Sequence, residues 1–433
     1  GGGQGGGEEW QEVGVGRAYV PGDHDVGFLL KFEAVPVDAA TGEELAPPST
    51  VLTQRVMPAP PPPVRGMVRV APEVTEAGGR FTVLSYNVLA DLYATQDMYP
   101  QCPTWALHWS YRRQHLVKEL LGYDADILAL QEVQSDHFEE WFAPELARHG
   151  YTAVYKRKTT QIYTGTAYAI DGCATFYKAE RFALIKKYEV EFNKAALSLS
   201  ESHASTSSKK EALNRLMKDN VALISVLEAL EAKGAGGGGK RQLLCVANTH
   251  IHANPELKDV KLWQVHTLLK GLEKIAASAE IPMVVCGDFN SVPGSAAHQL
   301  LATGSIDAAH PELATDPLGI LRPPSKLCHQ LPLVSAYTSL AKPESLQQSP
   351  DPPAVEAQRA RLDPVTSEPA FTNCTNDFQG TLDYVFYTCD SVEPLALLEL
   401  PTKAEVSESG STMPNQRWSS DHVALKAEFR WLR

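Results

Sequence analysis

The sequence contains no hydrophobic run long enough to cross a membrane and no Cys-x-x-Cys pair. A membrane-spanning helix needs about 20 consecutive apolar residues, and no stretch of these 433 residues approaches that length. The seven cysteines are odd in number and unclustered. Those within predicted strands are expected to behave as small core residues. We therefore expect no membrane span and a reducing compartment, which is the cytoplasm and, as a second option, the nucleus.

An excess of positive charge is also missing. The formal net charge of −13 argues against a protein that coats nucleic acid electrostatically. It does not exclude a nuclease, because a carboxylate-rich site binds its cation before a phosphodiester approaches. Lys156-Arg157-Lys158 is the densest basic cluster after residue 80. Solvated surface is the simpler interpretation of this cluster, and guidance of a phosphate backbone is the alternative.

Composition divides the chain into four regions. Residues 1–9 are a Gly-rich leader without the basic and apolar parts of a signal peptide. Residues 10–57 contain β-like stretches at 11–20, 28–37 and 50–57, which predict a small β module. Residues 58–79 begin with a proline-rich run and indicate a linker rather than a recruiting ligand. Residues 80–433 alternate strands and helices. A flexible Gly-rich loop at 235–239 and an insertion at 341–368, predicted to be disordered, interrupt this alternation.

Amphipathic spacing predicts helices at 111–121, 141–147 and 262–277. Short β-branched runs bounded by turn formers predict buried strands at 81–84, 126–130, 243–247 and 283–286. Each of these strands is followed by polar residues, and the pattern recurs near the C-terminus. The six motifs are Ser85-Tyr86-Asn87, Gln131-Glu132, Asn248-Thr249-His250, Gly287-Asp288-Phe289-Asn290, Leu382-Asp383-Tyr384 and Ser420-Asp421-His422.

The motifs supply carboxylates, carboxamides and imidazoles but no cysteine. Strand after strand is expected to deliver these groups to one edge of a sheet. This set of donors suits a hard, oxygen-binding cation such as Mg²⁺ better than zinc. The sequence therefore predicts a metal-dependent phosphodiesterase.

Residues 80–433 resemble the endonuclease/exonuclease/phosphatase superfamily, and within it most closely the carbon catabolite repressor 4 deadenylases. Beyond the six motifs, the likeness rests on residues 85–95, 102–113, 171–178, 189–193, 218–222 and 377–387. The β module, from Gly16 onward, resembles the N-terminal region of plant-type members. The resemblance implies an α/β fold, a four-layer sandwich of two packed mixed sheets flanked by helices, with a small N-terminal β module.

The resemblance also implies roles for the acidic residues. Glu132 is the expected Mg²⁺ ligand, with Asp288 and Asp421 beside the metal, and one or two Mg²⁺ ions bind. Asp288 would position or deprotonate the attacking water. His422, oriented by Asp383, would hydrogen-bond the scissile phosphate or activate water.

The resemblance also implies roles for the amides and for other histidines. Asn87 would contact the phosphate or help to place the metal-binding glutamate, and His250 would donate to a non-bridging oxygen. A structural polar role is the alternative for both. Asn290 would lie near the phosphate and the base. His252 and His266 are interpreted as ordinary structural or surface histidines.

Substrate recognition rests on two further positions implied by the resemblance. Phe378 would stack on an adenine at the 3′ end, and Pro255 would pack against its other face. Such stacking is worth roughly 1–3 kcal/mol per base, and a core position is the alternative for Phe378. The family often has an aromatic residue after its second motif histidine, whereas Ala253 follows His252 here, which leaves part of that wall undefined.

The sequence thus predicts an Mg²⁺-dependent 3′–5′ exoribonuclease that shortens poly(A) tails and releases 5′-AMP. Its partners would be poly(A) RNA and other deadenylase-complex subunits. Contact through a leucine-rich repeat is not expected, because no Leu-x-x-Leu-x-Leu pattern precedes residue 80. A phosphodiesterase or phosphatase acting on 2′,5′-oligoadenylate or on a phosphorylated dinucleotide is the first alternative. A catalytically silent adaptor working through its β module is the second, and the intact motif residues argue against it.

Overall fold

The computed structural model describes residues 10–71, 79–165, 167–200, 206–230, 242–341, 352–407 and 412–432. The chain divides into two compact units, Gly1–Pro61 and Pro62–Arg433. The predicted leader 1–9 and the predicted loop 235–239 lie outside the described residues, as does the segment 342–351 of the predicted insertion.

The first unit contains a two-stranded antiparallel sheet. Strand β1 (Leu29–Ala34) pairs with β2 (Ser49–Arg55), with Phe32 opposite Val51, as two of the three predicted stretches require. The strand predicted at 11–20 is wrong, because this stretch has no regular structure. Two glycines, Gly14 and Gly16, interrupt it, and glycine weakens a strand by conformational entropy and by the absence of a side chain to pack.

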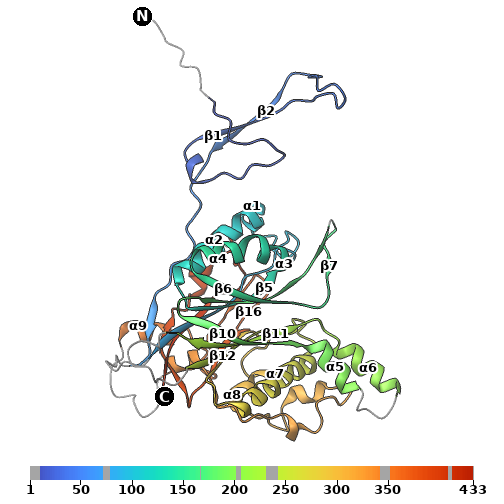
Figure 1. Cartoon of the computed structure of the whole chain (residues 1–433), viewed down its shortest axis with the longest axis vertical. Helices are drawn as coiled ribbons and strands as arrows, with labels where there is room; N and C mark the ends of the chain where they lie inside the picture. The colour runs from blue at the N-terminus through green and yellow to red at the C-terminus, as the bar shows by residue number, and fades with distance from the viewer. Residues whose placement is uncertain are drawn as a thin grey trace, which may run out of the picture. The chain divides into compact units, whose positions relative to one another are not determined.

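Two larger sheets form the second unit (Figure 1). Two neighbouring pairs, β4–β5 and β12–β13, are parallel, and the other pairs are antiparallel, so both sheets are mixed. The seven-stranded sheet has the order β3 (Met67–Arg69), β18 (Val392–Leu398), β19 (Leu425–Trp431), β4 (Arg80–Asn87), β5 (Ile127–Gln134), β9 (Asp171–Lys178), β6 (Tyr151–Arg157). The six-stranded sheet has the order β10 (Phe182–Glu191), β11 (Val221–Ala229), β12 (Leu243–His250), β13 (Met283–Asp288), β17 (Asp383–Thr388), β14 (Leu333–Ser335).

Side-chain alternation along the strands creates the layers. On β12, Leu244 and Val246 face the core between the sheets, while Cys245 and Ala247 pack under helices. Because fully burying one such apolar side chain is worth about 1.5–3 kcal/mol, strands that are apolar on both faces need a cover on each face. The helices on the six-stranded sheet are α5 (Phe192–Ser200), α6 (Thr206–Leu216), α7 (Lys258–Ser278) and α8 (Ala296–Thr303). Those on the other sheet are α2 (Trp109–Tyr123) and α4 (Ala143–Arg148). The predicted four-layer α/β sandwich is confirmed.

The predicted helices and strands of this unit are present with small shifts of their ends. Helices α2 and α7 cover the predicted 111–121 and 262–277. The helix predicted at 141–147 begins as α4 at residue 143, because one wide turn over Phe138–Phe142 precedes it. Shorter elements are α1 (Thr104–Leu107), α3 (Ser135–His137), β7 (Ile162–Tyr163), β8 (Tyr168–Ala169), α9 (Pro353–Arg359), β15 (Asn373–Cys374), β16 (Gln379–Gly380) and α10 (Lys403–Val406).

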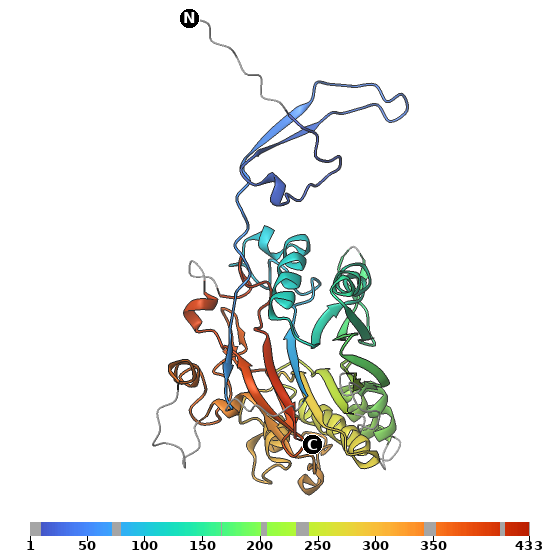
Figure 2. The ribbon, with the colours of Figure 1, turned by 60° about the vertical axis from the view of Figure 1, so that its left-hand side comes forward.

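The linker predicted at 58–79 is shorter than composition suggests. Strand β3 lies within it and pairs with β18 (Figure 2). Arg65, just before β3, donates from Nε to the Tyr123 hydroxyl at 2.9 Å, and from its two Nη atoms to the carbonyls of Glu399 at 3.0 Å and Ala424 at 2.8 Å. These contacts attach the segment from Pro62 to the larger unit, so the domain boundary lies near residue 61 rather than 80.

The disordered insertion predicted at 341–368 is wrong for its described second half. This part contains α9 and ends on Glu368, which is 1% exposed. The Glu368 carboxylate lies 3.1 Å from His298 Nε2 and accepts a bond of 2.8 Å from the Ser335 hydroxyl. Composition gave a false signal because one buried, fully partnered carboxylate anchors a segment that has few apolar residues.

None of the helices in the described part of the chain combines the length and the apolar character needed to cross a membrane.

Candidate active site

The strand ends bring the motif residues together. In the register of the sheets, Asn87 on β4 lies beside Gln131 on β5, and Asp288 on β13 lies between His250 on β12 and Asp383 on β17. Asn87 Nδ2 donates to Asp288 Oδ2 at 3.0 Å, a bond that joins one sheet to the other. The polar residues therefore meet at a single edge of the sandwich, as predicted.

A β-bulge directs Glu132 into this site. The β5–β9 register shifts between Leu130 and Val133, and Glu132 has a left-handed φ of 54°. Left-handed backbone is unfavourable for glutamate and often marks a functional position. The carboxylate is held on both oxygens, by Asn87 Nδ2 at 2.9 Å and by the Ala90 backbone N–H at 3.0 Å.

Asn248, on β12 of the other sheet, stabilises the bulge through hydrogen bonds. The bulge interrupts the ladder between β5 and β9, which leaves backbone carbonyls in need of donors. Asn248 Nδ2 donates to the carbonyls of Leu130 at 3.1 Å and Ala174 at 2.9 Å, and Oδ1 accepts from Gln131 Nε2 at 2.8 Å. Asn248, within a predicted motif but without a predicted role, therefore helps to fix the residue that precedes Glu132.

Gly287 allows the neighbouring strands to approach before Asp288. Its φ is +142°, and a Cβ atom at this position would lie 2.0 Å from the carbonyl oxygen of Thr249. No larger residue fits without moving β13 away from β12. The glycine of the Gly-Asp-Phe-Asn motif thus sets the spacing between His250 and Asp288.

His422 is hydrogen-bonded to Asp383, the pairing that the resemblance implies. His422 Nδ1 lies 2.7 Å from Asp383 Oδ2, which also accepts a bond of 2.6 Å from the Thr372 hydroxyl. Burial alone would lower the pKa of His422, but the charges of Asp383, Asp421 and Asp288 outweigh it and raise this pKa well above its usual value. The imidazole is therefore held as a cation in the absence of other ligands.

The pKa values of Asp288 and His250 are shifted in opposite directions. Burial, followed by the charge of Asp383, raises the pKa of Asp288 to about 7. Burial, followed by the charges of Lys158 and His422, lowers the pKa of His250 well below its usual value. His250 Nε2 lies 3.6 Å from Asp288 Oδ2. A neutral imidazole thus lies beside a carboxylate that titrates near neutrality.

Asp421 is held by two residues that the sequence analysis did not identify. The Tyr99 hydroxyl and Asn373 Nδ2 both donate to Asp421 Oδ2, each at 3.0 Å. That oxygen lies 3.9 Å from His422 Nε2. Tyr99 and Asn373 belong to no recognisable motif, and only the fold brings them to Asp421.

Of the remaining predicted site residues, Asn290 contacts this centre, whereas Pro255 and Phe378 are exposed side chains. Asn290, with a left-handed φ of 47°, donates from Nδ2 to the Ile251 carbonyl at 2.8 Å. Its backbone N–H donates to Asp288 Oδ1 at 2.8 Å. Pro255 is exposed. Phe378 lies between β15 and β16 and is 38% exposed, so the alternative of a core position is wrong for Phe378.

Only part of the basic cluster at 156–158 is solvated surface. Lys156 Nζ lies 3.2 Å from Glu189 and 2.5 Å from Glu191. Lys158 is buried, and its amine lies 2.8 Å from Asp171 Oδ2. Arg157 between them is exposed. Two of the three cations are therefore paired within the protein.

The site has the donors for a divalent cation. Two groups of three side chains each place one ligand atom per residue within 4.8 Å of the others. Asp383 Oδ1 and Asp421 Oδ1 are buried and have no hydrogen-bond partner within the described residues. A cation would offset the repulsion between these carboxylates and serve such oxygens. The groups are Glu132, His250 and Asp288, and Asp288, Asp383 and His422.

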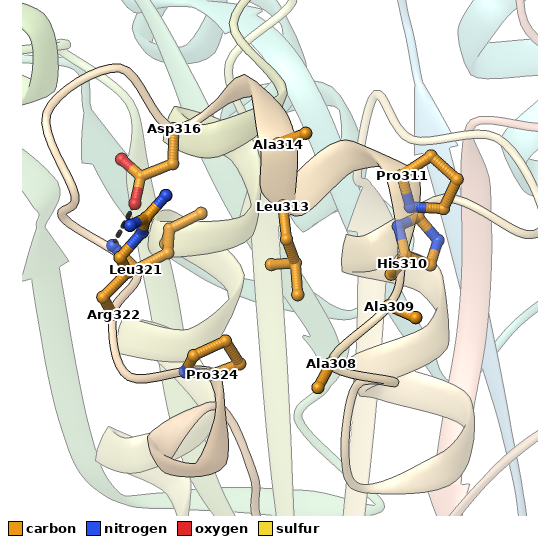
Figure 3. Close-up of a pocket in the computed structure, with 10 residues that line it drawn as sticks. All are labelled: Ala308, Ala309, His310, Pro311, Leu313, Ala314, Asp316, Leu321, Arg322 and Pro324. Carbon is orange, nitrogen blue, oxygen red and sulfur yellow. Dashed lines mark hydrogen bonds between the residues drawn. The ribbon is translucent and has the colours of Figure 1, made fainter.

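A separate pocket of about 450 Å³ lies around the short helix η4 (Pro311–Thr315) (Figure 3). Its one carboxylate, Asp316, accepts backbone bonds from Ile320 and Leu321, each at 2.9 Å. None of the predicted site residues lines this pocket. The predicted site residues are therefore gathered at the strand ends and not in this cavity.

Comparison with known proteins gives the class of the chain. It belongs to the Endonuclease/Exonuclease/phosphatase family, whose model matches residues 84–422. The match includes all six motifs, from Ser85 to His422.

Particular relatives narrow this class. The chain is 57% identical over 436 residues to the Carbon catabolite repressor protein 4 homolog 1 of Arabidopsis thaliana, covering 98% of this chain and 71% of that protein. It is 33% identical to the CCR4-Not complex 3′-5′-exoribonuclease subunit Ccr4 of Schizosaccharomyces pombe, covering 83% and 50%. Among solved structures, ANGEL2, described as a 2′,3′-cyclic phosphatase in complex with adenosine-2′,3′-vanadate, has a TM-score of 0.64 and 29% identity, covering 85% and 98%. The resemblance to carbon catabolite repressor 4 proteins is confirmed.

Proposed function

We propose that this protein is an Mg²⁺-dependent 3′–5′ exoribonuclease that shortens poly(A) tails and releases 5′-AMP. The observation that carries the proposal is the convergence of six motifs at one edge of the sandwich, in a chain 57% identical to a carbon catabolite repressor 4 homologue. The printed name of the fission-yeast relative, a 3′-5′-exoribonuclease subunit, supports the direction of cleavage.

Each residue has a chemical task in this reaction. Glu132, Asp288 and Asp421 would hold Mg²⁺, which when bound neutralises charge on the phosphate oxygens. Asp288 would also position the attacking water or accept a proton from it. His422, cationic beside Asp383, would donate from Nε2 to a phosphate oxygen as negative charge grows.

Two further residues, Asn87 and His250, contact these carboxylates. Asn87 divides its amide between Glu132 and Asp288, which holds two carboxylates from different sheets at a fixed separation. His250, neutral and next to Asp288, can donate only one ring N–H, so its other nitrogen stays available as an acceptor.

The adenine preference rests on Phe378. An exposed aromatic ring near the site can stack on the terminal base, with Pro255 as the proposed second wall. Stacking alone tolerates every base, so the proposal predicts a preference for A-tails rather than an absolute restriction. Contacts with other subunits of a deadenylase complex are proposed from the name of the fission-yeast relative.

The test is a ladder assay on 5′-labelled RNAs that differ only in the last residues. Tails of about 20 A, of about 20 C, and of 2′,5′-linked A are incubated with Mg²⁺. The proposal expects stepwise shortening from the 3′ end, fastest on the A-tail. Equal rates on the A and C tails would contradict the proposed base preference. Activity confined to the 2′,5′-linked tail would instead support a 2′,5′-oligoadenylate phosphodiesterase.

A second candidate is phosphatase action on a 2′,3′-cyclic end, because the ANGEL2 structure shares 29% identity with this chain. An RNA ending in a 2′,3′-cyclic phosphate separates the two. Removal of the terminal phosphate without shortening of the chain would favour this candidate over the exonuclease.

A further inference from the structure

A small β-hairpin emerges next to the active site. It consists of β7 and β8, and Figure 1 shows it projecting from the end of the seven-stranded sheet. We call Ile162–Tyr163 with Tyr168–Ala169 the aromatic hairpin. Nothing in the proposed chemistry uses it.

The base of this hairpin is fixed to the site. Lys158 precedes it and Asp171 follows it, and their side chains form a buried ion pair at 2.8 Å. The Tyr93 hydroxyl donates to Asp171 Oδ1 at 3.2 Å. Asp171 also pairs in register with Gln134, two residues after Glu132. The residues that flank the hairpin therefore lie close to the proposed metal ligand Glu132.

The tip of the hairpin presents aromatic rings to solvent. Tyr163 is 60% exposed and Tyr168 is 69% exposed. They are cross-strand partners, and their rings lie 5.2 Å apart at 52°. Because the rings are tilted rather than stacked, their faces are available. Such a cross-strand pair stabilises a hairpin by only about 0.2–1 kcal/mol, and rings this exposed also offer a surface on which another molecule can stack.

The position favours single-stranded RNA as that molecule. Arg157 is exposed at the end of β6, directly before the base of the hairpin. A cation followed by exposed aromatic rings is the combination that binds a phosphate backbone and its bases without sequence preference. The RNA chain also continues upstream of its 3′ end, so an RNA whose 3′ end occupies the site must leave past one of the walls of the site.

We propose that the aromatic hairpin is a stacking platform for the RNA upstream of the scissile bond, with Arg157 facing its phosphates. This inference rests on the proposed RNA substrate. It gives the enzyme a contact that depends on substrate length, distinct from the contact made by Phe378 with the terminal base.

The test compares long and short substrates on the full chain. Tyr163→Ser/Tyr168→Ser removes the rings, and Tyr163→Phe/Tyr168→Phe keeps them without the hydroxyls. Phe28→Ser, a 65% exposed aromatic position in the first unit, is the matched control. The serine pair should lower kcat/KM on an A-tail of about 20 nucleotides by about ten- to a hundredfold, as expected for lost base stacking. Its kcat/KM on the dinucleotide ApA should equal that of the wild type. The phenylalanine pair and Phe28→Ser should match the wild type.

Binding gives an independent readout. In a Glu132→Gln background, fluorescence anisotropy with the labelled A-tail should show a weaker Kd for the serine pair by the same factor. Unchanged Kd, or equal losses on the tail and on ApA, would overturn the platform. A change of oligomeric state in sedimentation with an unchanged Kd would assign the hairpin to a protein contact instead. If no RNA is shortened by the wild type, the proposed function fails, and the Kd comparison still decides on the hairpin.

Discussion

The Asp383 carboxylate and the His422 imidazole meet at 2.7 Å in a buried site, and this contact determines the protonation of the histidine. Asp383 is the largest of the charges that raise the pKa of His422. A histidine kept cationic can donate to a phosphate oxygen over a wide range of pH. When its partner charge is lost, the same imidazole becomes neutral at lower pH.

Asp383→Asn is therefore predicted to change the pH profile. The substitution keeps the shape of the side chain but removes its charge, so the pKa of His422 falls. Activity that requires the protonated form then declines at lower pH than in the wild type. The kcat–pH profile should show its alkaline limb moved to lower pH, with kcat reduced by roughly 10²–10⁴. An alkaline limb in the wild-type position would show that His422 does not act as the proton donor.

Phe378→Ala tests base recognition at the same scale. Because Phe378 is 38% exposed, the melting temperature should change little. Digestion of the A-tail should slow by about ten- to a hundredfold, from ~1–3 kcal/mol of lost stacking. A nitrophenyl phosphodiester, which has no purine, should lose much less. Equal losses on both substrates would contradict the stacking role.

The sequence predicted individual residues where chemistry and strand position coincide. Asp383 and His422 follow this rule, and the pairing between them that the family resemblance implied is present. Tyr99 and Asn373, which hold Asp421, could not be predicted because no local sequence pattern distinguishes them from other polar or aromatic residues outside the motifs. Phe378 shows the converse limit, since an aromatic next to a strand suits the core or the surface equally well until the fold is known.

At the scale of elements, the bulge in β5 is the feature on which the site depends. It turns Glu132 out of the ladder, and Asn248 satisfies the carbonyls that the bulge leaves without partners. Alternation of apolar residues predicted the strands β4, β5, β12 and β13. It could not predict the bulge, because a single left-handed residue leaves no mark on the hydrophobic pattern, and its supporting amide comes from the other sheet.

Asn248→Leu is predicted to loosen this element. Two buried carbonyls lose their donor, at a cost of about 1–3 kcal/mol each, so the melting temperature should fall. Glu132 should also lose its fixed position, which would raise the Mg²⁺ concentration needed for half-maximal activity. Thr249→Val is the matched control, because it removes one buried bond, to the Val221 carbonyl at 3.1 Å, without touching β5. A similar Mg²⁺ requirement in both variants would show that Asn248 has only a structural role.

At the scale of the whole molecule, two units of unequal size share one chain. The larger unit has two mixed sheets with a common core, and the smaller one has an exposed two-stranded sheet. Composition correctly predicted a proline-rich linker between the two units, but it placed the end of this linker at residue 79, whereas the larger unit begins at Pro62. Prolines predict a linker from local composition. The contacts of Arg65 and β3 that end this linker are long-range, and local composition does not reveal them.

The boundary predicts how the chain tolerates truncation. A chain that starts at residue 62 should keep its melting temperature, since β3 and Arg65 are retained. A chain that starts at residue 80 loses an edge strand and three charge-assisted bonds, worth about 1.5–3 kcal/mol each. Thermal unfolding of the two should differ by many degrees. Equal melting temperatures would place the boundary at residue 80 after all.

The central claim is that one cation-dependent site at the strand ends removes nucleotides from the 3′ end of RNA. The most direct measurement follows a 5′-labelled, A-tailed RNA with the wild type in Mg²⁺, in EDTA, and in EDTA followed by excess Mg²⁺. The account predicts a descending ladder with release of 5′-AMP in the first and third conditions and intact RNA in the second. Glu132→Gln, run in parallel, should be slower by several orders of magnitude at an unchanged melting temperature. Cleavage that persists in EDTA, or fragments cut within the body of the RNA, would contradict it.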